Sequence, residues 1–155
     1  MSINRQKKYF GPLKPSEVTP PKPRVEIKQL GRKRIDVQAP AKLPYLMMGY
    51  KAPVVLTTDE DWEPYALEVL ANVLDGGDSA RLTNELVRGS EIAVSAGAGY
   101  DAFDRMEGLF LFSGTPSNGN SVKALETALL AQVKKLQEEP VSQAELDRVK
   151  AQIRA

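Results

Sequence analysis

The chain has 155 residues, of which 42% are hydrophobic and 26% charged, and a net charge of +1. This length fits one globular domain, and the composition excludes a fibre or a wholly disordered chain; no apolar run reaches the roughly 18 residues that a membrane-spanning helix needs. Histidine and cysteine are both absent, which excludes disulfides, thiolate chemistry, a Ser-His-Asp triad and any zinc site of imidazole and thiolate.

The first 34 residues form a basic segment. They carry ten lysines and arginines against two glutamates, a net charge of +8 that leaves −7 for the rest. Residues 4–9 are expected to form the tail of a helix, and prolines at 12, 15, 20, 21 and 23 predict an extended linker after it. We expect the segment to lie on an acidic body or neighbour. The alternative is an arm for nucleic acid or anionic lipid, but only Tyr9 and Phe10 could stack on bases, so we predict no nucleic-acid partner.

Two strands and a helix are expected next. Residues 33–38 alternate apolar and polar side chains, and residues 45–50 are almost continuously apolar, so both segments are predicted strands. Asp61 is expected to cap a helix that has Pro64 in its first turn. Gly76 and Gly77 are expected to end this helix.

A short helix and a hairpin follow in the predicted order. Asp78 or Ser79 is expected to cap a helix that places Leu82 and Leu86 on one face. Residues 92–100 alternate as a strand does, and residues 108–114 are its expected hairpin partner. Gly97 and Gly99 would leave one face of the first strand nearly bare, so we expect either a closely packed helix there or the backbone of another chain.

The C-terminal part is predicted to be helical. Residues 122–139 place Val122, Leu125, Leu129, Val133 and Leu136 on one face. Ser142 and Glu145 have the spacing of a capping box for a last helix that continues almost to residue 155, so the chain is expected to be truncated within that helix. The element order predicts an α+β fold, in which an antiparallel or mixed sheet of about four strands carries paired helices on one face.

Few residues are candidates for catalysis or for binding a ligand or metal ion. Asp59, Glu60 and Asp61 form the densest carboxylate cluster, which could hold Mg²⁺ or Ca²⁺, although acidic residues at a helix start more simply satisfy free amides. GGDSARL lacks the remaining residues of a phosphate-binding loop and is better explained by the end of one helix and the cap of the next. Arg81 and Arg88 could clasp a carboxylate or form a solvated or interdomain ion pair. We predict no catalytic and no metal-binding residue.

Five segments together resemble one family: KKYFGPL, LPYLMMGYKAP, YALEVLANVLDGGDSARLTNELVR, IAVSAGAGYD and EEPVSQAELDRVKAQ. The chain resembles, over nearly its whole length, the second, non-zinc-binding domain of pitrilysin/insulinase-type zinc metallopeptidases, which include mitochondrial processing peptidase. In this family the first domain carries the inverted zinc motif His-x-x-Glu-His. The resemblance therefore implies a metallohydrolase-like peptidase domain without its own cofactor, and Zn²⁺ in an upstream domain.

The resemblance also implies partners and one site residue. The expected partners are the upstream zinc-binding domain, a second peptidase half or partner subunit, and a peptide substrate. Family members hold the substrate backbone with an arginine and a following tyrosine; Arg88 stands at the arginine position, whereas the tyrosine position falls on Val94. Arg88 is the candidate substrate-binding residue. The missing tyrosine suggests instead that this domain belongs to the zinc-bearing half, with the substrate clamp supplied by a partner subunit or a second half. Because residues 96–99 are small, we also expect their strand to pair with an extended peptide if its edge is free.

The expected organisation has two parts. Residues 1–32 would be the helix tail and the Pro-rich basic linker from an upstream domain, and residues 33–155 the non-catalytic α+β domain. The expected function is a structural and substrate-chamber domain of a zinc-dependent endopeptidase, inactive by itself. The alternative is a domain of a catalytically dead homologue that acts as an assembly subunit. The compartment is not assigned by the sequence, and exported bacterial relatives favour the periplasm.

Overall fold

The computed structural model describes residues 3–14, 16–20, 22 and 28–154. The chain divides into two compact units, Met1–Gln38 and Ala39–Ala155. The first unit contains helix α1 (Ile3–Phe10), which confirms the predicted helix over residues 4–9. Its described residues after Gly11 are without helix or strand, as expected for the linker, while linker residues 15, 21 and 23–27 lie outside the described part.

The strand predicted over residues 33–38 is wrong. These residues adopt neither helix nor strand, and the side chains of Ile35 and Val37 are 82% and 80% exposed. Alternation alone cannot make a strand, because each strand needs a hydrogen-bonding partner on at least one side. Pro40 and Pro44 follow closely and separate this segment from the next strand.

The second unit is built on an antiparallel sheet of three strands, β1 (Leu46–Ala52), β2 (Ala93–Gly99) and β3 (Gly108–Pro116), in the order β1-β3-β2. Phe112 of β3 lies opposite Met48 of β1 and Ala98 of β2, which fixes the register on both sides. The α+β class is confirmed, and the described residues supply three strands where about four were expected. Both β1 and β2 are edge strands of this sheet.

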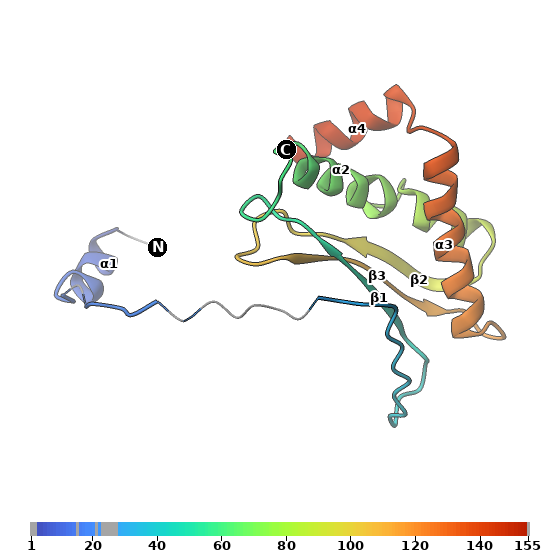
Figure 1. Cartoon of the computed structure of the whole chain (residues 1–155), viewed down its shortest axis with the longest axis horizontal. Coiled ribbons are helices and arrows are strands. Elements are labelled where there is room, and N and C mark those ends of the chain that lie inside the picture. The colour runs from blue at the N-terminus through green and yellow to red at the C-terminus, as the bar shows by residue number, and fades with distance from the viewer. Residues whose placement is uncertain (1–2, 15, 21, 23–27, 155) are drawn as a thin grey trace. The chain divides into compact units, whose positions relative to one another are not determined.

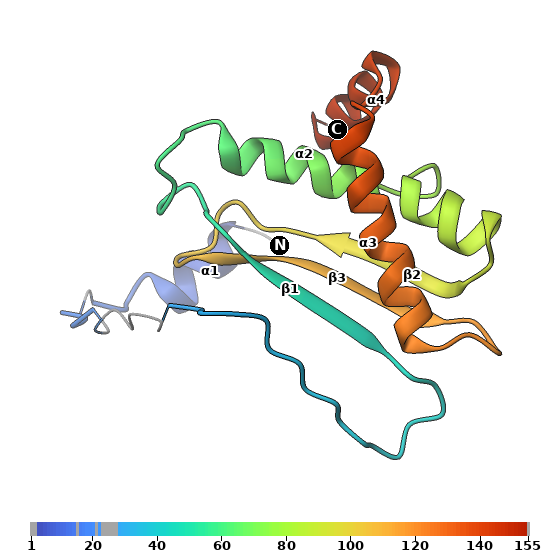
Figure 2. The same ribbon diagram turned by 45° about the vertical axis from the view of Figure 1, so that its right-hand side comes forward.

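Four helical segments cover one face of the sheet. They are α2 (Glu63–Asp75), the π-helix η1 (Thr83–Gly89), α3 (Val122–Glu138) and α4 (Gln143–Arg154). Figure 1 and Figure 2 show α2 and α3 on the same side of the sheet, with α4 beyond α2. Helices α2 and η1 contact β2, α3 contacts β3 and β1, and α4 contacts α2.

The core lies between the sheet and these helices. Gly114 of β3 is tightly enclosed, because a Cβ placed there would lie 2.6 Å from the Ser95 carbonyl oxygen of β2 and 3.1 Å from Leu125 Cδ2 of α3. The predicted face of α3 is confirmed: Leu125 and Leu129 are fully buried, and Val122, Val133 and Leu136 pack on the core. Phe110 and Phe112 meet at a ring-centroid distance of 5.2 Å and fill the centre of the sheet.

Two details of the predicted helix starts are wrong. Asp61 does not cap α2, which begins after Trp62 without a side-chain cap, although Pro64 does lie in its first turn. Likewise, η1 begins after Leu82 without a side-chain cap. The glycines are confirmed as the end of α2, because the Gly76 amide donates to the Asn72 carbonyl and Gly77 has a φ of +100°.

The alternation predicted for β2 is interrupted. The pairing of β2 with β3 shifts between Ala93 and Ser95, and this irregularity leaves the Val94 side chain 58% exposed. A bulge adds one residue to one strand and therefore turns the following side chains to the other face. As a result Ala93 and Ala96 are both buried, which a strict two-residue repeat forbids.

Ser121 supports the start of α3. Its hydroxyl oxygen accepts a hydrogen bond from the Ala124 amide at 3.1 Å, and its backbone is extended, as in an N-cap. We expect Ser121→Ala to lower the free energy of unfolding by about 1 kcal/mol, since one helix amide loses its acceptor. Chemical denaturation would measure this, with Ser121→Asp as the matched control that keeps an acceptor. Equal losses in both variants would contradict a capping role.

Candidate functional site

The edge of the sheet formed by Ala96–Gly99, here called the β2 edge, meets the C-terminal end of α2. Asp75, the last residue of α2, extends its carboxylate to this edge, where Oδ2 accepts a hydrogen bond from the Ala98 amide at 3.2 Å. Because β2 pairs only with β3 in the sheet, this amide points away from β3. A side chain therefore occupies one backbone position of an otherwise open strand edge.

The environment of Asp75 raises the pKa of its carboxyl above the ordinary value of 3.8, because partial loss of water outweighs the hydrogen bond from Ala98, which lowers it. The helix does not favour the charge either. A carboxylate at a helix C-terminus is repelled by the macrodipole, and the last turn of α2 has no basic residue to offset it. The hydrogen bond to β2 thus partly offsets the unfavourable placement of a carboxylate at the C-terminus of α2.

The two glycines of β2 have different surroundings. A Cβ on Gly97 would lie 2.8 Å from Asp75 Oδ2, whereas a Cβ on Gly99 would meet nothing within 4 Å. Of the two expectations for this strand, the close approach of a helix is found at Gly97. A Cβ on Gly99 would point to a face of the sheet and not to its edge, so pairing of this edge with an added peptide stays a prediction.

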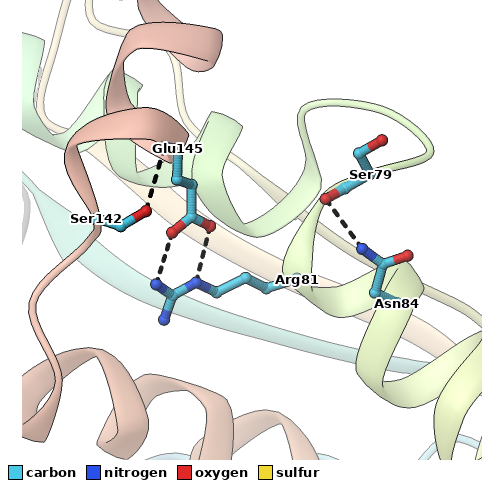
Figure 3. Close-up of polar contacts among 5 residues, drawn as sticks. All are labelled: Ser79, Arg81, Asn84, Ser142 and Glu145. Carbon is cyan, nitrogen blue, oxygen red and sulfur yellow. Dashed lines mark hydrogen bonds and ion pairs between the residues drawn. The ribbon is translucent and has the colours of Figure 1, made fainter.

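Arg81 and Glu145 form a bidentate ion pair next to this edge. Arg81 precedes η1, and its Nε and NH2 groups donate to the two Glu145 carboxylate oxygens at 2.9 and 2.7 Å (Figure 3). Glu145 lies in the first turn of α4, whose position next to α2 is thereby tied to η1. The two arginines do not share one carboxylate: Arg81 pairs with Glu145, and Arg88 lies in a separate, solvated pair with Asp78.

The predicted capping box forms only in part. The Ser142 hydroxyl accepts from the Glu145 amide at 3.3 Å, as expected, while the Glu145 carboxylate faces Arg81 (Figure 3). The hydrogen bond from Arg81 holds the pKa of Glu145 below its usual value near 4.5 and exceeds the opposing effect of burial. The same bond raises the pKa of Arg81, so both groups are charged across the ordinary pH range.

Arg88 lies at the end of η1 and folds back toward the loop after α2. Its NH1 donates to the Asp78 carbonyl oxygen at 3.1 Å, and its NH2 lies 3.8 Å from the Asp78 carboxylate. The side chain is 59% exposed, so another group could still reach the guanidinium. The π-helical geometry of η1 and the positive φ of Glu91, at 52°, mark this turn as irregular. Such irregularities often accompany functional sites.

In the two acidic turns, at residues 58–61 and 101–104, side-chain oxygens accept hydrogen bonds from nearby backbone amides. Thr58 Oγ1 accepts from the Glu60 amide, and Asp101 Oδ1 accepts from the Phe103 amide, so both acidic turns are organised by their own backbone. Within the described residues, no three or more histidine, cysteine, aspartate or glutamate side chains are placed to hold a metal ion. Tyr100, next to the second turn, donates its hydroxyl hydrogen to the Pro53 carbonyl.

Sequence reasoning missed Asp75, although a signal existed. A lone acidic residue in the last turn of a predicted helix, directly before the glycines that end it, contradicts the helix macrodipole. Such a conflict between local preference and position is often found at functional sites. Nothing in the periodicity of β2 indicated that its edge would meet this particular side chain.

In the described part of the chain, none of the helices combines the length and the hydrophobicity that crossing a membrane requires.

Comparison with known proteins finds a matching family, a related protein and a similar solved structure. The family model described as Peptidase M16 inactive domain matches residues 3–153. The zinc protease PqqE of Helicobacter pylori (strain ATCC 700392 / 26695) is 31% identical over 108 residues, which cover 70% of this chain and 23% of that protein. The crystal structure of a protease from Helicobacter pylori superposes with a TM-score of 0.65 and 29% identity, covering 74% of this chain and 26% of that one. The chain thus matches about a quarter of the length of these two relatives.

Proposed function

The chain belongs to the family of Peptidase M16 inactive domains, and from this premise we propose that it is a structural and substrate-chamber domain of a zinc-dependent endopeptidase. Membership confirms the predicted resemblance to pitrilysin/insulinase-type peptidases, and the description of the family as an inactive domain supports a non-catalytic role. The observation that carries the proposal is the family match over residues 3–153 in a chain without histidine or cysteine.

In this proposal the catalytic zinc belongs to a different domain from the one described. Zinc in hydrolytic sites is held mainly by imidazole, with carboxylate or thiolate ligands beside it, and the described carboxylates do not group as ligands. The residues present therefore do not fit the metal. We assign Zn²⁺ to an upstream domain, residues 1–32 to the connection from it, and residues 33–155 to the domain proper.

The β2 edge supports a role beside a peptide substrate. An extended peptide can add to an open sheet edge through main-chain hydrogen bonds, and small side chains on the receiving strand leave room for its backbone. Ala96, Gly97, Ala98 and Gly99 provide such a strand, and the space over the face of Gly99 is open. In this proposal the β2 edge forms part of the chamber wall.

The uncovered face of the sheet supports a place inside a larger protein. Met47 of β1 and Leu109 of β3 point away from the helices and are 63% and 48% exposed. Leu111 lies between them on the same face, next to Gly49. Apolar side chains gathered on one side of a sheet are commonly buried by another domain or subunit. The upstream domain and a second peptidase half are the partners that we propose.

Arg88 remains the proposed contact to substrate. Its exposed guanidinium lies at the end of η1, next to the turn that leads into β2. An arginine can donate several hydrogen bonds to peptide carbonyl groups at once. Binding of substrate there would need the guanidinium to exchange its hydrogen bond to the Asp78 carbonyl for one to the peptide.

Because the proposal places zinc in another domain, it predicts that the isolated chain neither retains zinc nor cleaves peptides. After dialysis we expect no retained zinc by elemental analysis, and no cleavage of a fluorogenic peptide library above a buffer blank. Addition of the separately expressed zinc-binding domain of the same peptidase is expected to restore zinc-dependent cleavage. A zinc content of one ion per isolated chain, or peptide cleavage by that chain alone, would contradict the proposal.

A further inference from the structure

The position of Asp75 at the β2 edge has a consequence for any peptide that binds there. In a strand, the amide and carbonyl of one residue point to the same side, and alternate residues point to opposite sides. The Ala98 amide faces outward to Asp75, so the backbone groups of Ala96 also face outward. A peptide that adds to this edge needs the Ala98 amide as a donor, and Asp75 Oδ2 already accepts its hydrogen.

The Asp75 carboxylate also occupies space that an added peptide strand would need. Asp75 Oδ2 lies 3.2 Å from the Ala98 nitrogen, in the place where an acceptor on an added strand would lie. The same oxygen would lie 2.8 Å from a Cβ on Gly97, so it also contacts one face of the strand. An incoming peptide strand would run about 4.8 Å from β2. Such a strand and the carboxylate cannot occupy the same place.

We propose that Asp75 is an autoinhibitory residue of the β2 edge, which it closes by taking the Ala98 amide and which opens when an extended peptide displaces the carboxylate. This inference rests on the proposed function of that edge. Asp75 lies at the very end of α2, where a change of side-chain rotamer moves the carboxylate away without disturbing the helix. An acidic side chain is unfavourable at a helix C-terminus. The hydrogen bond to β2 gives a structural reason for its presence there.

Closure of the β2 edge by Asp75 also protects the chain against association with other strands. An open strand edge presents unpaired amides and carbonyls to other chains and invites edge-to-edge association. A carboxylate on such an edge repels further strands and occupies a donor. Asp75 would thus keep the β2 edge unpaired until a peptide with sufficient contacts replaces it.

The test uses a fluorescein-labelled peptide of alternating threonine and valine as the probe. Its affinity for the chain is measured by fluorescence anisotropy, and the binding site by the amide shifts of Ala96–Gly99. We expect Asp75→Ala to bind the probe about fivefold more tightly than the unaltered chain, which corresponds to one net hydrogen bond that no longer competes. An N-methylated form of the probe, which cannot donate from its backbone, is expected to lose binding.

Asp61→Ala is the matched control, because it removes the same charge from an exposed side chain just before α2. We expect it to bind the probe as the unaltered chain does. A second measurement needs no peptide: the Ala98 amide should exchange its hydrogen faster in Asp75→Ala, whereas the Asp61→Ala variant leaves this rate unchanged.

The outcomes separate the two proposals. Equal affinities of the unaltered chain and Asp75→Ala, with shifts in Ala96–Gly99 in both, would overturn autoinhibition and leave the peptide edge standing. Absence of any shift in that strand, in every variant, would remove the peptide edge and autoinhibition with it.

Discussion

Leu125→Ala is expected to lower the free energy of unfolding by about 2–5 kcal/mol, the range for a fully buried leucine. Leu125 has no exposed surface, and its Cδ2 would lie only 3.1 Å from a Cβ placed on Gly114 of the sheet. Truncation removes apolar contacts and leaves a cavity, which the close backbone packing at Gly114 prevents from collapsing. Urea denaturation followed by circular dichroism would give the change.

Leu130 provides the matched control for Leu125. It lies on the same helix, is of the same residue type, and is 37% exposed. We expect Leu130→Ala to change the free energy of unfolding by less than about 1 kcal/mol, because less apolar surface is lost and no closed cavity forms. Similar losses for both leucines would mean that α3 does not pack on the sheet through the face described.

The faces of the long elements could be predicted because periodicity carries that information. The apolar repeat from Val122 to Leu136 gave the buried face of α3, and the two glycines after Asp75 gave the end of α2. Which strands pair with each other is harder to predict from periodicity. The alternation of residues 33–38 suggested a strand, yet a strand also requires a neighbour with unpaired backbone groups, and this is a property of the whole sheet.

The candidate site depended on contacts between residues far apart in the sequence. Asp75 meets Ala98, and Arg81 meets Glu145, across separations that no local pattern reports. Glu145 illustrates the reason: the spacing from Ser142 favoured a capping box, but a guanidinium brought in by tertiary packing offered its carboxylate a bidentate partner. Charge-assisted bidentate bonds are stronger than a single bond to an amide, so the tertiary contact prevailed.

The ion pair between Arg81 and Glu145 leads to the second large effect. We expect Arg81→Ala to lower the free energy of unfolding by about 2 kcal/mol, because two hydrogen bonds to a charged group are lost and Glu145 keeps an unpaired charge in a mostly buried place. Both side chains retain about a fifth of their surface exposed, at 21% and 19%, which reduces the loss below that of a fully buried pair.

A double-mutant cycle isolates the pair itself. The variants Arg81→Ala, Glu145→Gln and their combination should show a coupling energy of about 1 kcal/mol by chemical denaturation. Glu138→Gln is the control, since Glu138 pairs with Lys134 at 3.6 Å on an open surface where both side chains are more than half exposed. It should have no measurable effect. Additive losses in the cycle would show that Arg81 and Glu145 stabilise the chain independently.

The pair also predicts a dependence on pH. Because the pKa of Glu145 in the folded chain is below its usual value near 4.5, the stabilisation is complete above that value and is lost as the pH falls through the lower, folded pKa. The stability difference between the unaltered chain and Glu145→Gln should therefore be constant near neutral pH and shrink in acid. A difference that grows as the pH falls would mean that the carboxylate of Glu145 is not held by Arg81 in the folded chain.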